Sequence, residues 1–120
     1  MNQNSNEQQS DKRRRLSESF LNMWDGFPHP VLLLHKSRLI IDANQAARDL
    51  GVPLGVKCRD ISPYPDKCKN HCQADKALAD GIWKRLVSRE KEKVSATYWI
   101  PIHAGEDGLY LHFTVDVPEA

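Results

Sequence analysis

The sequence predicts an α+β fold, in which a five-stranded antiparallel sheet carries helices on one face and a further helix precedes it. Three observations predict this fold. Apolar residues near the N-terminus recur with helical spacing, two short apolar runs follow before residue 42, and three strand-like segments close the chain after residue 81. Turn-forming residues and short helical stretches fill the region between the two groups of strands. Because this insertion interrupts the strands, its helices are expected together on one side of the sheet.

The composition bounds the class of protein. With 120 residues, 40% of them hydrophobic and 28% charged, the chain is expected to form one globular domain. The formal net charge is +1, so we do not expect nucleic acid as a partner, and we interpret the basic run at 12–15 as a solvated helix end. There is no apolar leader, and the longest apolar run, at 31–34, is far shorter than the roughly 20 residues of a membrane span. We therefore expect a cytoplasmic protein without membrane contact, whose cysteines are thiols or metal ligands.

The N-terminal region predicts a tail and then a helix. Residues 1–11 are polar and are expected to be disordered, and residues 12–27 are expected to form an amphipathic helix that ends at Asp25-Gly26. The apolar stripe of this helix consists of Leu16, Phe20, Met23, Trp24 and Phe27. The stripe has two interpretations. It either packs on the sheet of its own domain or pairs with the same helix of a second chain.

Residues 28–118 are expected to form the domain itself. The apolar runs at 31–34 and 39–41 predict a hairpin around the polar turn 35–38. Asp42 or Asn44 is suited to cap a short helix over 45–50, which Gly51 ends. A second helix is predicted over 74–80, where Gly81 follows.

The last forty residues predict three strands, over 82–88, 93–102 and 109–117. For 82–91 a continuation of the preceding helix is the alternative. The last strand alternates strictly, so one face of it is expected to carry Leu109, Leu111, Phe113, Val115 and Val117. His112 falls on the opposite side, for which we expect an exposed face or an interface rather than a ligand pocket.

The hairpin and its continuation resemble a known family. The segment Ile41-Asp42-Ala43-Asn44-Gln45-Ala46-Ala47, followed by Gly51 and Gly55, is similar to the opening of a PAS domain. The closing strands match as well, so the resemblance covers about residues 20–118. It implies that Asn44 ends the second strand and ties it to the helices.

The three cysteines resemble a subset of that family. Cys58, Cys68 and Cys72 stand where PAS domains of some bacterial histidine kinases and transcription activators carry a three-cysteine loop. No kinase, ATPase or DNA-binding region follows the sheet in this sequence. The resemblance therefore implies a sensory module that acts as a homodimer, or through a partner such as a histidine kinase or a transcription regulator.

The chemistry of these cysteines leaves three alternatives open. Cys58, Cys68 and Cys72, with His71 as a possible fourth ligand, can bind zinc or an iron–sulfur cluster. In a helix His71 would point about 100° away from Cys72, which disfavours a shared ion. Alternatively the thiols form a redox-reactive set, or they are small buried residues of the helical layer.

Other cofactors and catalysis are not favoured. Haem is less favoured than a metal, because the helix predicted over 74–80 contains no histidine. Flavin is not expected, because Lys57 replaces the asparagine of the Asn-Cys-Arg motif found in flavin-binding LOV domains. We do not expect an enzyme, because the sequence has no phosphate-binding glycine loop, no Gly-x-Ser-x-Gly and no His-Glu-x-x-His.

The hypothesis from the sequence is a sensory module that detects a small ligand, a metal or a redox change through the loop 58–78. Its N-terminal helix would provide the dimer or partner contact. The alternatives are a ligand-free protein–protein interaction module and a domain stapled by a structural zinc.

Overall fold

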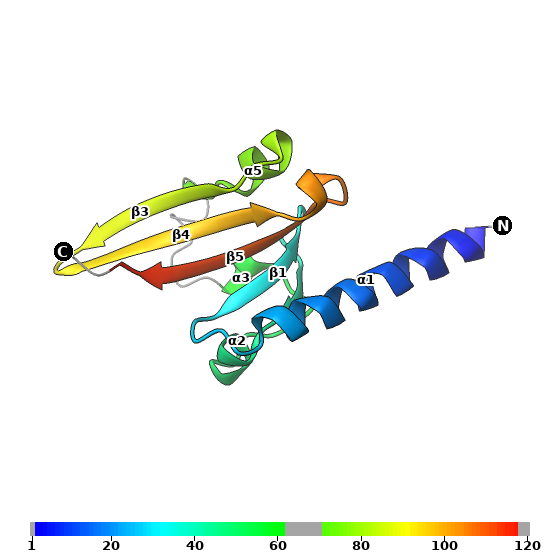
Figure 1. Ribbon diagram of the computed structural model, residues 1–120, viewed down its shortest axis with the longest axis horizontal. Coiled ribbons are helices and arrows are strands. Elements are labelled where there is room, and N and C mark those ends of the chain that lie inside the picture. Colours follow the sequence, from blue (N-terminus) through cyan, green and yellow to red (C-terminus); the bar gives the residue numbers. More distant parts are fainter. Residues whose placement is uncertain (1, 62–70, 118–120) are drawn as a thin grey trace.

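The computed structural model describes residues 2–61 and 71–117, and side chains from residue 11 onward. Its centre is a five-stranded antiparallel sheet with the strand order β2-β1-β5-β4-β3 (Figure 1). The strands are β1 (Val31–His35), β2 (Ile40–Ala43), β3 (Lys84–Glu90), β4 (Lys93–Pro101) and β5 (Leu109–Asp116). The described helices are α1 (Asn2–Trp24), α2 (Gln45–Asp49), α3 (Cys58–Ile61) and α5 (Ala74–Asp80), with a short 3-10 turn, η1 (His103–Gly105). The predicted fold class is confirmed.

Residues 84–90 form a strand and do not continue the preceding helix, which was the alternative for 82–91. Lys84–Glu90 pairs with β4 along its whole length, from Lys84 opposite Trp99 to Glu90 opposite Lys93. Residues 91 and 92 make the tight turn between them, and Lys91 has a positive φ of 55°. Helix α5 ends at Gly81, whose positive φ of 67° gives a left-handed C-cap. The cap stops the helix, so the segment that follows is free to pair as a strand.

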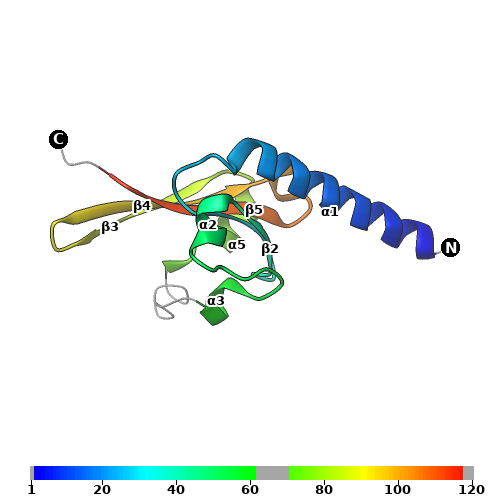
Figure 2. The same ribbon diagram turned by 90° about the horizontal axis from the view of Figure 1, so that it is seen from below.

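Helix α1 begins earlier than expected, at Asn2 rather than near Lys12. No proline or glycine lies between Asn2 and Trp24, so nothing in the sequence interrupts the helix there. Its N-terminal half stands away from the sheet (Figures 1 and 2). The division into a tail, a helix and a PAS-like region remains a prediction.

Two layers of helices lie on opposite faces of the sheet. Figure 2 shows α1 on one face, which we call the outer face, and α2 and α3 on the other, which we call the helical face. Each face has its own apolar cluster. The outer cluster has a buried centre of Phe20, Val31, Leu33 and Leu111. The helical cluster has a buried centre of Leu34, Ile40, Ala74, Ala77, Trp99 and Tyr110.

The apolar stripe of α1 is used mainly on its own sheet. Phe20 is only 2% exposed, and Leu16, Trp24 and Phe27 pack around it in the outer cluster. Met23 is the exception, with 73% of its surface exposed. The stripe thus packs on the sheet of its own domain, as in the first interpretation. Met23 is the stripe residue that remains open to a further contact.

The alternation of β5 is present, with a consequence that the sequence did not indicate. Leu111 and Phe113 belong to the outer cluster, as expected for one face. Tyr110, the residue before Leu111, points to the opposite face and is buried in the helical cluster. His112 therefore lies on the helical face, stacked on Trp99 with ring centroids 5.1 Å apart. His112 is half-buried there, so it does not lie on a fully exposed face, whereas the alternative of an interface stays a prediction.

The β4–β5 connection holds α5 over the helical face. Gly105 has a positive φ of 86°, and a Cβ placed there would lie 2.5 Å from the carbonyl oxygen of Leu78 in α5. Only glycine permits this approach without a backbone shift. The contact fixes α5 beside β4 and β5, and so positions the residues of the helical cluster.

Candidate functional site

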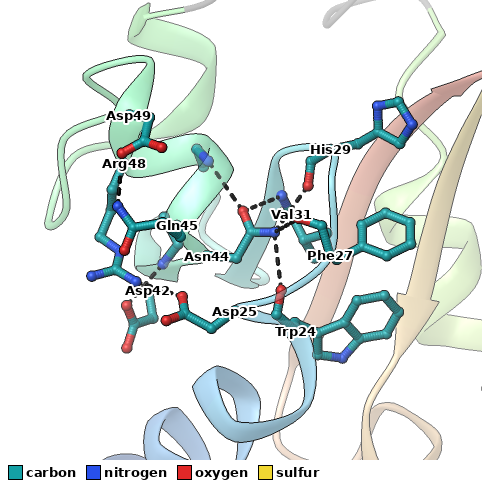
Figure 3. A network of polar contacts seen from close by, with 12 residues as sticks. Trp24, Asp25, Phe27, His29, Val31, Asp42, Asn44, Gln45, Arg48 and Asp49 are labelled. Carbon is teal, nitrogen blue, oxygen red and sulfur yellow. Dashed lines mark hydrogen bonds and ion pairs between the residues drawn. The ribbon is translucent and has the colours of Figure 1, made fainter.

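Asn44 is the polar centre that joins the two layers (Figure 3). Its side chain is fully buried at the end of β2. The Oδ1 atom accepts hydrogen bonds from the backbone N–H groups of Val31, at 2.8 Å, and Ala47, at 3.1 Å. The Nδ2 group donates to the carbonyl oxygens of Trp24, at 3.1 Å, and His29, at 2.9 Å, with a longer contact of 3.4 Å to Phe27.

These bonds connect four parts of the chain through one side chain. Trp24 is the last residue of α1, Phe27 and His29 lie in the segment that leaves it, Val31 begins β1, and Ala47 lies in α2. The bond to Ala47 also makes Asn44 the N-cap of α2. A second link, the ion pair between Arg48 of α2 and Asp25, lies beside it on the surface. The end of α1 on the outer face is therefore tied to a helix of the helical face, which agrees with the role implied by the resemblance.

Arg38 is a buried cation on the helical face of the sheet, next to helix α5. It occupies the β1–β2 turn with a positive φ of 76° and is 7% exposed. Its guanidinium donates to the carbonyl oxygen of Lys36 at 2.8 Å and pairs with Asp75 of α5 at 3.1 Å. The two members of this ion pair differ in burial, because the Asp75 side chain is 82% exposed whereas the Arg38 side chain is buried. Solvent screens such a carboxylate, so the pair compensates the buried charge only in part.

The backbone next to Arg38 places a cysteine beside it. Residues after Gly55 continue the edge of β2 through hydrogen bonds from Ile40 N–H to the Val56 carbonyl and from Gly55 N–H to the Ile40 carbonyl. The N–H of Cys58 then donates to the carbonyl of Arg38 at 2.9 Å. This pairing fixes the first residue of α3 against the turn that carries the guanidinium.

Tyr110 faces the same region from β5. It is 1% exposed, and burial raises the pKa of its phenol well above the usual range, although Arg38 acts in the opposite direction. No side-chain oxygen or nitrogen of the described residues is both fully enclosed and unpaired.

His112 completes the polar side of the cluster. Its Nδ1 donates to the carbonyl oxygen of Tyr98 at 3.1 Å, which fixes Nδ1 as the protonated nitrogen of the neutral ring. Burial lowers the pKa of His112, and the nearby Arg38 lowers it further. The ring is therefore held neutral against the face of Trp99.

Two of the three sequence-predicted cysteines meet at this cluster. Cys58 and Cys72 both pack against the helical cluster, which contains Tyr110. Cys68 lies outside the described residues. His71 is exposed, and Cys72 lies outside a helix, so the predicted helical angle between the two residues does not apply. Within residues 11–61 and 71–117, no group of three or more His, Cys, Asp and Glu side chains is close enough to hold a metal ion, so the three-cysteine prediction stays untested.

The sequence singled out the cysteines but missed Arg38, Tyr110 and Trp99. The signal that could have found them is the alternation of the last strand. It assigns Tyr110 and His112 to one face, and the helices predicted over 45–50 and 74–80 must cover some face of the sheet. Arg38 gave no signal, because an arginine in a polar hairpin turn is ordinarily exposed.

Comparisons with solved structures place the fold. The chain is similar to a sensory box sensor histidine kinase from Vibrio cholerae, with 19% identity, a TM-score of 0.61, and coverage of 94% of this chain and 95% of that one. It is also similar to the PAS domain of Bordetella pertussis BvgS, with 17% identity, a TM-score of 0.64, and coverage of 85% and 86%. A third neighbour is the phage VqmA–DPO complex, with 13% identity, a TM-score of 0.66, and coverage of 88% of this chain and 55% of that one.

These neighbours define a class of fold. The chain has a PAS-like fold, and its structural neighbours include PAS domains and a sensor histidine kinase. No family model matches the sequence, and no curated protein matches it. Among the described residues, no helix is both long enough and apolar enough to cross a bilayer.

Proposed function

We propose that this chain is a PAS-like signal-sensing module. Its input is a change at the cluster of Arg38, Cys58, Cys72 and Tyr110 on the helical face, and its output is a change at α1 on the outer face. The observation that carries the proposal is the Asn44 network, because one buried side chain bonds both to the end of α1 and to the helical layer. A rearrangement of that layer alters the geometry at Asn44 and so biases the position of α1.

The comparisons support the sensing part of this proposal. A sensory box sensor histidine kinase and the PAS domain of BvgS share the fold, and one neighbour was solved as a VqmA–DPO complex. Fold alone does not assign a ligand, so the site residues of this chain carry the rest of the argument.

The proposal is tested by perturbing the helical face chemically and observing α1. In the full chain with Cys58→Ala and Cys68→Ala, methyl methanethiosulfonate converts Cys72 into a methyl disulfide, which adds bulk against the helical cluster. Amide hydrogen exchange is then measured for the peptide covering residues 20–31. Faster exchange after modification is expected there, because the Asn44 bonds to Trp24 and His29 loosen. The same treatment of a variant that also carries Cys72→Ala is the control.

Two outcomes contradict the proposal. The first is exchange that changes in α5, which follows Cys72, while the peptide 20–31 stays unchanged. The second is an equal change in β3, which shares no bond with Asn44, because this would show general loosening rather than transmission.

We further propose that the output of α1 is a homodimer or a contact with a partner such as a histidine kinase or transcription regulator. The exposed Met23 supports this, because it continues the apolar stripe on the side that the sheet leaves open. Sedimentation of the full chain tests the dimer. Met23→Glu is expected to shift a dimer to monomer, whereas Asn22→Glu, on an adjacent exposed position, is not. A dimer that withstands Met23→Glu would refute the role of this surface.

The metal or redox form of the input remains a finer proposal. Cys58 and Cys72 both pack against the helical cluster, which contains Tyr110, and this supports a sensing role for the thiols. Metal analysis and an absorption spectrum of the anaerobically purified protein test the zinc and iron–sulfur versions together. A colourless preparation without bound metal would contradict both and leave thiol oxidation, for which a thiol count before and after mild peroxide is the test.

A further inference from the structure

Strand β3 is a long edge strand with exposed apolar side chains. It stands at one end of the strand order β2-β1-β5-β4-β3, at the edge of the sheet farthest from α1 (Figure 1). The exposed large apolar side chains of the chain include three that lie on β3 or directly before it, namely Ile82, Trp83 and Val87. An edge strand of this kind is a template for pairing with another chain.

The opposite edge of the sheet is covered within the chain. The N–H of Ile40 in β2 donates to the carbonyl of Val56, the N–H of Gly55 donates to the carbonyl of Ile40, and Leu39 forms a β-bridge with Lys57. The edge of β2 therefore has a partner. Among the described strands, β3 has β4 as its one neighbour.

The backbone bonds of β4 show which residues face which neighbour. The N–H of Val117 donates to the carbonyl of Val94, and the N–H of Ile102 donates to the carbonyl of Leu109, each at 2.9 Å. Even-numbered residues of β4 thus direct their backbone groups to β5. Because successive residues of an antiparallel strand bond to opposite sides, its odd-numbered residues bond to β3.

The free side of β3 follows from this alternation. The odd-numbered residues of β4 lie opposite Lys84, Leu86 and Ser88. The intervening residues Arg85 and Val87 therefore direct their N–H and C=O groups away from β4, to the edge of the sheet. Both side chains are exposed.

We propose that β3 pairs antiparallel with β3 of a second copy of this chain, so that the two five-stranded sheets join into one. The pairing would bond the edge groups of Arg85 and Val87 across a two-fold axis. It goes beyond the proposed function and does not rest on it, because α1 contacts β1 and β2 at the other end of the strand order.

The side chains of β3 are complementary to themselves in one register. A two-fold axis at Leu86 places Leu86 opposite Leu86 of the second copy and Arg85 opposite Val87. Leu86 packs against the helical cluster, so this pairing would continue that cluster across the interface. No like charges lie opposite each other within the paired residues 84–88.

The neighbouring registers match less well. An axis at Val87 would place Arg85 opposite Arg89, and an axis at Arg85 would place two copies of Arg85 opposite each other. Like charges directly opposite in a sheet are destabilising. An axis at Ser88 would place Leu86 opposite Glu90. The pattern of charged and apolar residues thus favours a second copy in the register centred on Leu86.

The first test is sedimentation equilibrium of the full chain with two opposite charge changes at one exposed position. Val87→Glu is expected to lower the dissociation constant of the dimer about fivefold, because symmetry creates two Glu–Arg85 pairs, and Val87→Lys is expected to raise it about fivefold. The same two changes at Val117, an exposed residue after β5 on the same face but away from the edge, are the control and are expected to have no effect.

The second test determines the register by cross-linking. In a chain whose three native cysteines are alanine, Leu86→Cys is expected to form a disulfide-linked dimer under mild oxidation. Since the backbone groups of Leu86 point to β4, the two copies would form a non-hydrogen-bonded pair with Cα atoms about 4.5 Å apart, within disulfide range. Ser88→Cys and Val87→Cys are the controls, because the axis at Leu86 separates the two copies of each by two or more residues along the strand.

Three results would overturn the proposal. They are a monomeric full chain at all concentrations, a dimer whose dissociation constant is the same in both Val87 variants, and cross-linking by Ser88→Cys or Val87→Cys as efficient as that by Leu86→Cys. The outcome is separable from that of α1. A dimer that Met23→Glu abolishes and the Val87 variants leave unchanged would support α1 and refute the edge, whereas the reverse would support the edge and leave α1 to another partner.

Discussion

Removing the Asn44 side chain is expected to cost about 4 kcal/mol of unfolding free energy. Asn44→Ala deletes four hydrogen bonds of 3.1 Å or less and a weaker fifth at 3.4 Å. Each intramolecular hydrogen bond contributes about 1 kcal/mol net, so the four short bonds together give about 4 kcal/mol. No larger penalty is added for the backbone groups that lose their partner, because water partly rehydrates them. Against the about 5–15 kcal/mol that stabilises a typical domain, this is a large fraction.

The assay is urea unfolding followed by circular dichroism and tryptophan fluorescence. Asn22→Ala is the matched control, because Asn22 is an exposed residue of α1 and its replacement is expected to change stability by no more than about 0.5 kcal/mol. Asn44→Asp separates the two halves of the network, because a carboxylate keeps the acceptor for Val31 and Ala47 but cannot donate to Trp24 and His29. A difference below about 1 kcal/mol between Asn44→Ala and Asn22→Ala would refute the reasoning.

Three further predictions concern packing and protonation. Gly105→Ala is expected to destabilise the domain by about 1–3 kcal/mol in thermal unfolding, because the new methyl group meets a carbonyl oxygen of α5, whereas Gly26→Ala, with open space around it, is not; equal effects would contradict this. Phe20→Ala is expected to cost about 3–5 kcal/mol in urea unfolding and Met23→Ala less than about 1, and similar losses would refute the assignment of the buried side of α1. Because burial lowers the pKa of His112, the unfolded chain binds more protons near its ordinary value of 6.5, so stability is full above that pH and falls as the pH drops below it. His112→Asn, which can still donate to the Tyr98 carbonyl, is expected to flatten this pH dependence, and an unchanged slope would contradict it.

The sequence was sufficient for the sheet because its strands follow local rules. Alternation in 109–117, the apolar runs 31–34 and 39–41 and the glycine after 74–80 are all short-range signals. Asn44 was found by resemblance, and its position at the end of a strand agrees with its structural role. Its five bonding partners could not be inferred, because they come from segments up to twenty residues away.

The site was harder to predict than the fold. Cysteines attract notice by their chemistry and spacing, and two of them do reach the cluster. Arg38 and Tyr110 converge only because the β1–β2 turn, β5 and α5 meet on one face of the sheet, which is a tertiary fact. An exposed face was expected for His112 for the same reason, since periodicity assigns a residue to a face but does not say which face the helices cover.

The side-chain amide of Asn44 reports on the central claim most directly, because it belongs to the bond that links the helical face to α1. In the protein whose single cysteine is Cys72, its two Nδ2 protons can be followed by ¹⁵N–¹H NMR before and after methyl methanethiosulfonate. The account predicts slowly exchanging, resolved signals that move on modification, together with the backbone amides of residues 24–29. Signals of Asn44 that exchange like those of an exposed amide, or that stay in place while α5 responds, would contradict it.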